Sequence, residues 1–542
     1  MKPINDIARA LGIDPAVLEP YGHYKAKLPL SAFRDRPARG KLVLVSAITP
    51  TPAGEGKTTT TIGLTQGLTR IGVKSAAALR EPSLGPVFGM KGGGAGGGQS
   101  EVLPMMDINM HFNGDFHAIS SAHNLLAALL DNTLHNGSSR LDPRRVTWKR
   151  VVDMNDRSLR DIIVGLGGRT EGVPRESGFD ITAASEVMAI LCLANDVPDL
   201  KARLGRIVIG YAADGSPVTA ADIGAVGAMA ALLAQAVKPN LVQTTEGAPA
   251  FVHGGPFANI AHGTNSVSAT RAALSYADIV VTEAGFAFDL GAEKYFDINC
   301  RYGGFKPSCT VLVTTIRALK MHGGKPLAEV SKPDIEAMTR GFGNLEKHLE
   351  SVRKFGQTPV VAINGFPTDT PEEVAALKAR CAELGVVAVP SQPFGQGGAG
   401  CVELAETIRD IVARTEPGFT PLYDWSDSIE NKIGTIAREM YGAKGVEFAA
   451  RAKRDIEQLR KGGFDKLPVC MAKTQQSLSD NPALIGRPRD FTVNVREIQL
   501  AAGAGFIVPI TGEILRMPGL PKAPMSSAFD LSDDGEVLFS KS

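Results

Sequence analysis

Short apolar runs alternate with segments of helical spacing along the first 300 residues of this chain. The runs that predict strands are 42–45, 73–79, 206–210, 240–243 and 279–282. Helices are expected between or after them, at about 181–193, 220–237 and 269–276. This alternation predicts an α/β fold with a mostly parallel sheet, in which ligands bind beyond the carboxyl ends of the strands.

The alternation resumes after residue 300 and changes near residue 420. Thr370, Pro371 and Glu373 predict the capped start of a helix that runs to about Leu384. Strands are expected at 311–314, 358–363, 385–389, 467–471, 491–495 and 506–510, with charged helices over 421–466. Residues 1–40 are expected to form a helical lead-in. We therefore predict three domains, a large one at 1–300 and smaller α/β domains at 301–420 and 421–542.

One stretch joins the first predicted strand to a helix marked by Leu64, Leu68 and Ile71. It reads Thr51-Pro52-Ala53-Gly54-Glu55-Gly56-Lys57-Thr58. A strand, a glycine-rich turn, Lys-Thr and a helix, in that order, are typical of a phosphate-binding loop of P-loop NTPases. Backbone N–H groups and the helix N-terminus attract the anion, Lys57 adds a point charge, and Thr58 offers a hydroxyl to Mg²⁺. Thr51 stands where the usual pattern has glycine, so an ordinary tight turn is the alternative.

Arg80 follows the strand predicted at 73–79 and is therefore expected at the same sheet edge as the phosphate loop. A guanidinium is the natural bidentate partner of an acyl phosphate or a γ-phosphate. The alternative role is a structural ion pair with Glu81 or another acid.

The glycine-rich segment 85–98 favours neither helix nor sheet, and its apolar residues indicate an ordered loop near a ligand rather than a linker. His111, His117 and His123 recur every six residues, which argues against a compact zinc site. His253, His262 and Glu283 fall in loops at strand ends. For the histidines, functional and structural roles are equally compatible with the sequence.

Two aromatic residues follow the ends of predicted strands in the second unit. Phe366 comes after the strand at 358–363, and Phe394 after the strand at 385–389. Both are expected at one sheet edge, where they could clamp a flat heterocycle by stacking. Core packing against the sheet is the alternative.

The charge balance excludes some partners. The chain has 58 Lys and Arg against 57 Asp and Glu, so it offers no overall charge for nucleic acid or a membrane surface. No apolar run approaches the ~20 residues that span a bilayer, and the first residues lack the apolar core of a secretory signal. Six cysteines without a CxxC pair are typical of buried thiols in a reducing compartment. A cytoplasmic location is expected.

Taken together, these motifs resemble the formate–tetrahydrofolate ligases. The matching stretches run nearly end to end: 49–61, 79–90, 107–119, 172–194, 238–267, 282–301, 315–324, 341–348, 364–373, 467–480 and 501–521. The resemblance implies synthesis of 10-formyltetrahydrofolate from formate, ATP and tetrahydrofolate. It also implies MgATP, a monovalent cation (K⁺ or NH₄⁺) as activator, a homotetramer, and an NTPase-like large domain with two smaller ones.

For single residues, the resemblance implies that Thr51–Thr58 bind ATP, that Lys57 neutralises the transferred phosphoryl group, and that Thr58 helps to hold Mg²⁺. Arg80 would bind formyl phosphate and stabilise the leaving phosphate. Phe366 would form one face of a clamp for the pterin ring of the folate.

The chain departs from the family pattern on the folate side. Phe394 replaces the usual Trp, Gln99 the usual Tyr and Met106 the usual Glu, and Gly365 stands where a basic residue is usual. These changes predict an altered folate affinity or a different acceptor beside an intact phosphate side.

The expected reaction has two steps: formate attacks the γ-phosphorus of MgATP, and N10 of tetrahydrofolate then attacks the formyl carbon of formyl phosphate. Two other interpretations stay open. One is a nucleotide switch, because the loop also resembles those of partitioning and metal-chaperone ATPases. The other is an acyl-phosphate ligase with another acceptor amine.

Overall fold

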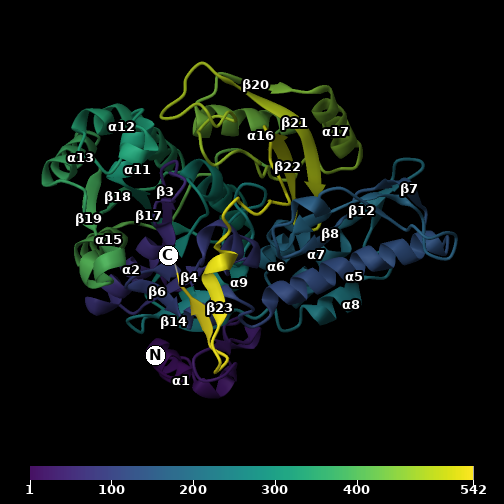
Figure 1. Ribbon diagram of the computed structural model, residues 1–542, viewed down its shortest axis with the longest axis horizontal. Coiled ribbons are helices and arrows are strands. Elements are labelled where there is room, and N and C mark those ends of the chain that lie inside the picture. The colour runs from purple at the N-terminus through teal and green to yellow at the C-terminus, as the bar shows by residue number, and fades with distance from the viewer. Residues whose placement is uncertain (541–542) are drawn as a thin grey trace.

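The computed structural model describes residues 1–540 and is built around one sheet of twelve strands (Figure 1). The main path runs β1-β2-β14-β15-β4-β16-β3-β17-β18-β19, and β6 attaches β5 to β14. The bounds are β1 (Glu19–Pro20), β2 (Ala26–Lys27), β3 (Lys41–Ala47), β4 (Ser75–Leu79), β5 (Gly96–Gly97), β6 (Ser100–Leu103), β14 (Asn240–Thr244), β15 (Pro249–Val252), β16 (Ile279–Glu283), β17 (Pro307–Thr314), β18 (Pro359–Asn364) and β19 (Val387–Ser391). Every neighbouring pair from β15 to β19 is parallel, which confirms the mostly parallel α/β fold.

The central sheet is covered by helices on both faces. Because side chains alternate along a strand, Leu42 and Leu44 of β3 enter one core while Val43 and Val45 enter another. The first core includes side chains of α9 (Val267–Tyr276), α11 (Ile316–His322), α12 (Ile335–Lys354) and α13 (Pro371–Glu383). The second is closed by α2 (Lys57–Arg70) and α15 (Val402–Arg414). Figure 1 shows α11–α13 above and α2 with α15 below the strands β17–β19.

Between β6 and β14 the chain forms a separate hydrophobic core on the right of Figure 1. Its helices are α5 (Asp115–His135), α6 (Glu186–Leu193), α7 (Val197–Gly205) and α8 (Val226–Leu232), whereas α4 (Met105–Asn109) packs in a small core beside β4, β6, β14 and β15. Its small sheets pair β7 (Leu141–Val146) and β13 (Pro217–Thr219) with β12 (Val208–Ala212), β8 (Arg150–Val152) with β11 (Phe179–Ile181), and β9 (Ile162–Val164) with β10 (Arg175–Ser177).

The C-terminal part adds α16 (Ile429–Ile436), α17 (Ala450–Lys461) and a three-stranded sheet of β20 (Gly445–Phe448), β21 (Thr492–Ala501) and β22 (Phe506–Thr511). The chain then crosses the front of the molecule to a hairpin of β23 (Phe529–Leu531) and β24 (Val537–Phe539) (Figure 1). There the ring of Phe529 lies 4.9 Å from that of Phe88. The last residues thus support the segment Val87–Lys91 from outside.

Several local predictions are corrected. The lead-in at 1–40 contains one α-helix, α1 (Ile4–Leu11), and two short 3-10 turns, but also β1 and β2, which extend the central sheet because β2 pairs with β14. The glycine-rich segment is not free of regular structure: Leu84–Pro86 and Val87–Lys91 form successive α- and π-helical turns before β5. The alanine-rich helix is confined to α8. The stretch 467–471 is no strand of its own and meets β22 only by isolated bridges.

Other predictions are confirmed. Thr370 Oγ1 accepts from the N–H of Glu373, whose carboxylate accepts in return from the N–H of Thr370. The strands β17–β19 of the predicted second unit belong to the same sheet as β3; the division at 300 and 420 stays a prediction. Within residues 1–540, no helix combines the length and the apolar character that crossing a bilayer requires.

Candidate active site

The phosphate loop leaves β3 at its carboxyl end and enters α2 through two glycines with left-handed backbone. Gly54 has φ 82° and Gly56 φ 76°. A Cβ atom on Gly56 would lie 2.5 Å from Asn364 Nδ2, so a larger residue would clash as well as strain the backbone. The conformation explains why glycine stands at both positions.

The side chain of Glu55 closes the loop. Its Oε1 accepts from the N–H of Thr51 at 2.7 Å, and its Oε2 accepts from Thr315 Oγ1 at 2.5 Å. Asn364 Nδ2 donates to the Glu55 carbonyl at 3.1 Å. Burial raises the pKa of Glu55, and the hydrogen bonds from Thr315 and Thr51 oppose this. Thr51, the residue in place of glycine, is therefore built into the loop, while Pro52, Ala53 and Gly54 stay exposed.

Three neighbouring parallel strands bring the charged groups together. β4, β16 and β3 end at one sheet edge, where Arg80 follows β4, Glu283 ends β16, and the phosphate loop follows β3. Arg80 Nη2 lies 3.3 Å from Glu283 Oε1, and Thr58 Oγ1 donates to Glu283 Oε2 at 2.7 Å. The prediction that Arg80 shares the edge of the phosphate loop is confirmed. Its acidic partner is Glu283 rather than Glu81.

The site carries more positive than negative charge. Desolvation and the charge of Arg80 lower the pKa of Lys57 to about 8, although Glu283 opposes them. Desolvation and Arg80 also lower the pKa of Lys91, although this residue is exposed. The Arg80 Nε is buried without a partner. The cations therefore repel one another until an anion joins them.

The pKa of Glu283 is lowered as well, but by its neighbours and against the effect of burial. Burial would raise it, but Arg80, the hydrogen bond from Thr58 and the charge of Lys57 together lower it. Glu283 is thus held as a carboxylate beside the Thr58 hydroxyl. Two oxygen atoms of this kind fit a hard divalent cation such as Mg²⁺. No group of three or more His, Cys, Asp or Glu suited to a metal occurs in residues 1–540, so phosphate or water oxygens would complete the shell.

Phe366 lies two residues beyond Asn364, which touches the phosphate loop. The Arg317 guanidinium stands 4.0 Å from the centroid of the Phe366 ring, and Arg317 Nη2 also donates to Thr368 Oγ1 at 3.1 Å. The ring is half-buried and is held by the hydrogen bond of its backbone N–H to Asp369 Oδ2 at 2.8 Å. One ring face is thus covered by Arg317, a residue that the strand pattern did not single out.

Phe394 lies on the adjacent strand end, in the short helix α14 (Pro393–Gln396), and is 65% exposed. Its ring lies against Gly97, where an added Cβ would approach Phe394 Cε2 to 3.2 Å. Its carbonyl accepts from the N–H of Gln99 at 2.9 Å. Phe394 and Gln99 are two of the positions where the sequence departs from the ligase pattern, and the fold joins them directly.

His253 and His262, in the loops at strand ends, are buried. His253 bonds to Ser266 Oγ at 2.6 Å and to the Ala236 carbonyl at 2.5 Å, and burial lowers its pKa to about 4. This pairing supports its structural role. His262 has no hydrogen-bond partner in the described chain, and burial with nearby Lys294 lowers its pKa to about 3. Neither is poised as a cation.

The comparison with protein families decides the identity. Residues 1–539 match the family model described as formate–tetrahydrofolate ligase. The chain belongs to this family. It is therefore an ATP-dependent ligase of one-carbon metabolism, in the family that joins formate to tetrahydrofolate through a C–N bond.

In this ligase, sequence patterns alone left three residues of the site without a role. Glu283 was visible as a polar strand end, but only the strand order β4-β16-β3 places it between Arg80 and Thr58. Lys91 lies in the glycine-rich segment, where no motif singled it out. Asn364, the last residue of β18, reaches a loop 309 residues away in sequence.

Proposed function

We propose that the phosphate side of this ligase makes formyl phosphate with Lys57, Arg80 and Lys91 as its cationic groups. The observation that carries the proposal is the meeting of Arg80, Lys57 and the Thr58–Glu283 pair at the ends of β4, β3 and β16. An excess of positive charge suits the anionic transition state of phosphoryl transfer, in which positioning and charge stabilisation do most of the work.

In the first step, a formate oxygen attacks the γ-phosphorus and ADP leaves. Thr51–Thr58 hold the phosphates of ATP, and Lys57 balances charge on the transferred group. Mg²⁺, bound near Thr58 and Glu283, would supply further neutralisation when present. The Arg80 fork suits the carboxylate of formate and then the phosphoryl oxygens of formyl phosphate. No side-chain nucleophile is required.

In the second step, N10 of tetrahydrofolate bonds to the formyl carbon, the C–O bond to phosphate breaks, and N10 releases its proton. Arg80 and Lys91 stabilise the departing phosphate. Phe366 offers its free face and Phe394 its exposed ring to the flat pterin, by stacking worth about 0.5–1.5 kcal/mol each. The orientation of the acceptor would then depend on two aromatic groups on adjacent strand ends.

A second candidate acceptor, another amine, is favoured by one observation. The replaced residues Phe394 and Gln99 contact each other, so the folate side has changed as a unit. We keep tetrahydrofolate as the first choice because the family match extends over residues 1–539.

We further propose Mg²⁺ and a monovalent cation (K⁺ or NH₄⁺) as activators, a homotetramer, and a location in the cytoplasm. The resemblance to the ligase family supports the cations and the tetramer. The six cysteines are buried and unpaired in the described chain, as is usual in a reducing compartment.

The direct test is the absorbance of methenyltetrahydrofolate after acid treatment of a reaction with formate, MgATP and tetrahydrofolate. The expected product requires all three substrates. Bound ATP without product at high enzyme concentration would favour the other acceptor. ATP hydrolysis at a rate that does not depend on formate, together with a nucleotide-dependent dimer, would favour a nucleotide switch.

A further inference from the structure

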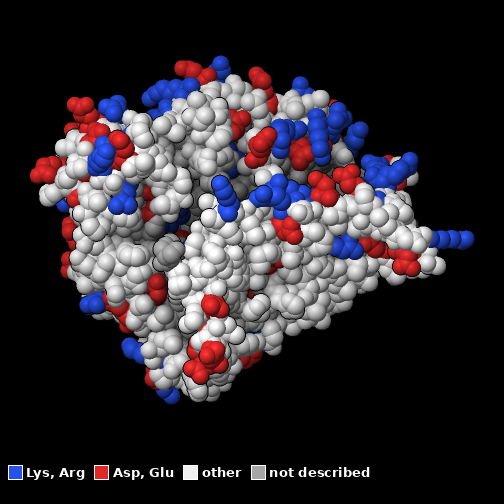
Figure 2. Space-filling view, viewed as in Figure 1, with Lys and Arg blue, Asp and Glu red and all other residues white. Residues whose placement is uncertain are grey.

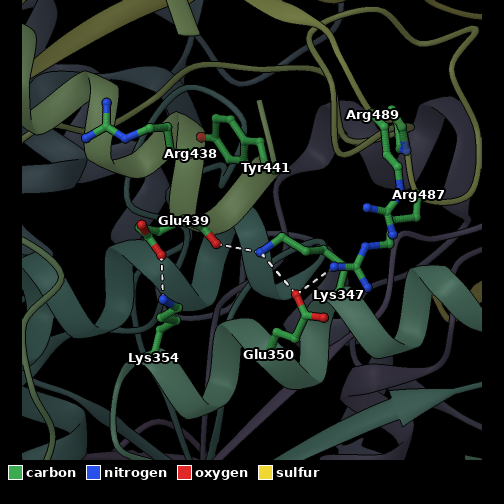
Figure 3. A pocket seen from close by; sticks show the side chains of 10 residues that line it. Lys347, Glu350, Lys354, Arg438, Glu439, Tyr441, Arg487 and Arg489 are labelled. Atoms are coloured by element: carbon green, nitrogen blue, oxygen red, sulfur yellow. Dashed lines mark hydrogen bonds and ion pairs between the residues drawn. The ribbon is translucent and has the colours of Figure 1, made fainter. Parts of the chain in front are cut away.

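A second cationic pocket lies away from the phosphate loop, between α12, the π-helical turn Ala437–Tyr441 and the segment 487–489 (Figure 3). Its volume is about 270 Å³. Five basic side chains line it against the two carboxylates of Glu350 and Glu439; they are Lys347, Lys354, Arg438, Arg487 and Arg489. The lining thus has a formal excess of three positive charges. We call it the α12 pocket.

The carboxylates do not satisfy all of these cations. Glu350 accepts from Arg487 Nη2 at 2.8 Å and forms a longer ion pair with Lys347 Nζ, at 3.9 Å. Figure 3 draws both pairs, which share the one carboxylate. Lys347 is 6% exposed, and its ammonium also donates to the backbone carbonyl of Glu439 at 2.5 Å. Arg489 is exposed and has no carboxylate partner within residues 1–540. Desolvation lowers the pKa of Lys347; the charges of Arg487 and Lys354 add to this effect, and those of Glu350 and Glu439 oppose it.

The segment with the two arginines is tied to the phosphate loop through buried hydrogen bonds. The Gly486 N–H donates to His322 Nδ1 at 3.1 Å, and the Gly486 carbonyl accepts from Asn344 Nδ2 at 2.8 Å. The same two side chains hold Thr49, two residues before the loop: Asn344 Oδ1 accepts from its N–H at 3.2 Å, and His322 Nε2 lies 2.8 Å from its carbonyl. Because Nδ1 accepts, Nε2 is the donor, and burial lowers the pKa of His322 and keeps the ring neutral.

We propose that the α12 pocket binds a compact polyanion, with two or more phosphate or carboxylate groups, and that its occupancy changes the affinity of the phosphate loop for ATP. Guanidinium forks and ammonium groups recognise both kinds of oxyanion. A bound anion would fix the side chains of Arg487 and Arg489 and thereby the backbone on either side of Gly486. A change there reaches Thr49 through one side chain, Asn344 or His322. Such coupling is reciprocal, so ATP must change anion affinity by the same factor.

The test uses the full chain and two probes, propane-1,2,3-tricarboxylate and inorganic tripolyphosphate, with calorimetry at constant ionic strength. The variant is Arg487→Gln combined with Arg489→Gln. Glu346 and Glu350, the partners of Arg487, are 35% and 42% exposed, so water can replace the arginine and the fold should persist. Arg489→Gln alone, which breaks no ion pair, is the milder second variant.

The matched control is Arg454→Gln combined with Arg496→Gln, two exposed arginines on α17 and β21. Figure 2 shows Lys and Arg gathered over that part of the surface, so the control separates a general positive field from the pocket. We expect the pocket variant to weaken binding by about tenfold or more, given the strength of charged hydrogen bonds, and the control to bind as the parent does. If the pocket variant binds only one of the two probes more weakly, that probe shows whether the ligand is a phosphate or a polycarboxylate.

Coupling is measured by ATP binding with and without the tricarboxylate, because tripolyphosphate would compete at the phosphate loop itself. The expected shift in ATP affinity is present in the parent and the control and absent in the pocket variant. Equal binding of the tricarboxylate by all three proteins would overturn the site. Anion binding without any shift in ATP affinity would overturn the coupling. Neither readout requires ligase turnover, so failure here is distinguishable from failure of the proposed chemistry.

Discussion

The phosphate side and the acceptor side of this ligase are built in different ways. On the phosphate side, the Glu55 carboxylate is buried with both oxygens bonded, and Glu283 joins Arg80 to Thr58. On the acceptor side, Phe394 is 65% exposed on a helix of four residues. Stabilisation of a charged transition state is lost when a hydrogen-bond donor is misplaced. Aromatic stacking, by contrast, tolerates replacement of one ring by another and small displacements of the ring. The acceptor side can therefore change in sequence while the phosphate side stays fixed.

The largest effect should come from the phosphate side. Arg80→Ala removes the guanidinium that meets Glu283 at the ends of β4 and β16, and we expect a loss of about 10³-fold in kcat, as for other removed transition-state cations. The measurement is the rate of formyltetrahydrofolate formation at saturating substrates. Arg80→Lys, which keeps the charge but not the fork, should recover part of the rate. Full activity of Arg80→Ala would rule out its assigned role.

Glu283→Gln should have the next largest effect. The change removes the carboxylate beside the Thr58 hydroxyl and leaves Arg80 without its acidic partner. We expect a loss of about 10²-fold in rate and a higher Mg²⁺ concentration for half-activation. A titration of activity with Mg²⁺ checks this. An unchanged Mg²⁺ requirement would show that Glu283 only orients Arg80.

The pH dependence of ATP binding tests Lys57. Its pKa in the free protein is about 8, and ATP binds the protonated form better. Affinity should therefore be full at about pH 7 and below and fall as pH rises through 8, approaching tenfold weaker by about pH 9. Lys57→Met should bind ATP weakly with little change over this range. If Lys57→Met keeps the parent profile, the titrating group is another one, with Lys91 the first candidate.

The smallest effect is expected on the acceptor side. Phe394→Ala should raise the KM for tetrahydrofolate about two- to tenfold, the range of one stacking contact, and leave ATP affinity unchanged. Phe394→Trp, with a larger ring, should lower that KM. The KM values of the two variants are measured by steady-state kinetics, with tetrahydrofolate varied at saturating MgATP and formate. A fall in ATP affinity for Phe394→Ala would show that the two sides are not independent.

Much of the phosphate side could be predicted from neighbouring residues. The strand at 42–45, the glycines at 54 and 56, and Lys57-Thr58 form one continuous segment, so local backbone preference and helix geometry determine their arrangement. The capping box at Thr370 and the position of Arg80 after a strand were predictable for the same reason. Each depends on residues a few positions apart.

The partners of these residues could not be predicted, because they depend on which strands lie side by side. Glu283 reaches Thr58 across 225 residues, and Asn364 reaches Glu55 across 309, only because β16 and β18 lie near β3 in the sheet. The segment Val87–Lys91 is helical despite the glycines around it, because packing of Phe88 against Phe529 of the C-terminal hairpin stabilises the turn. Local sequence determined which groups could bind phosphate. The order of strands and the packing around them decided which charges and rings would meet.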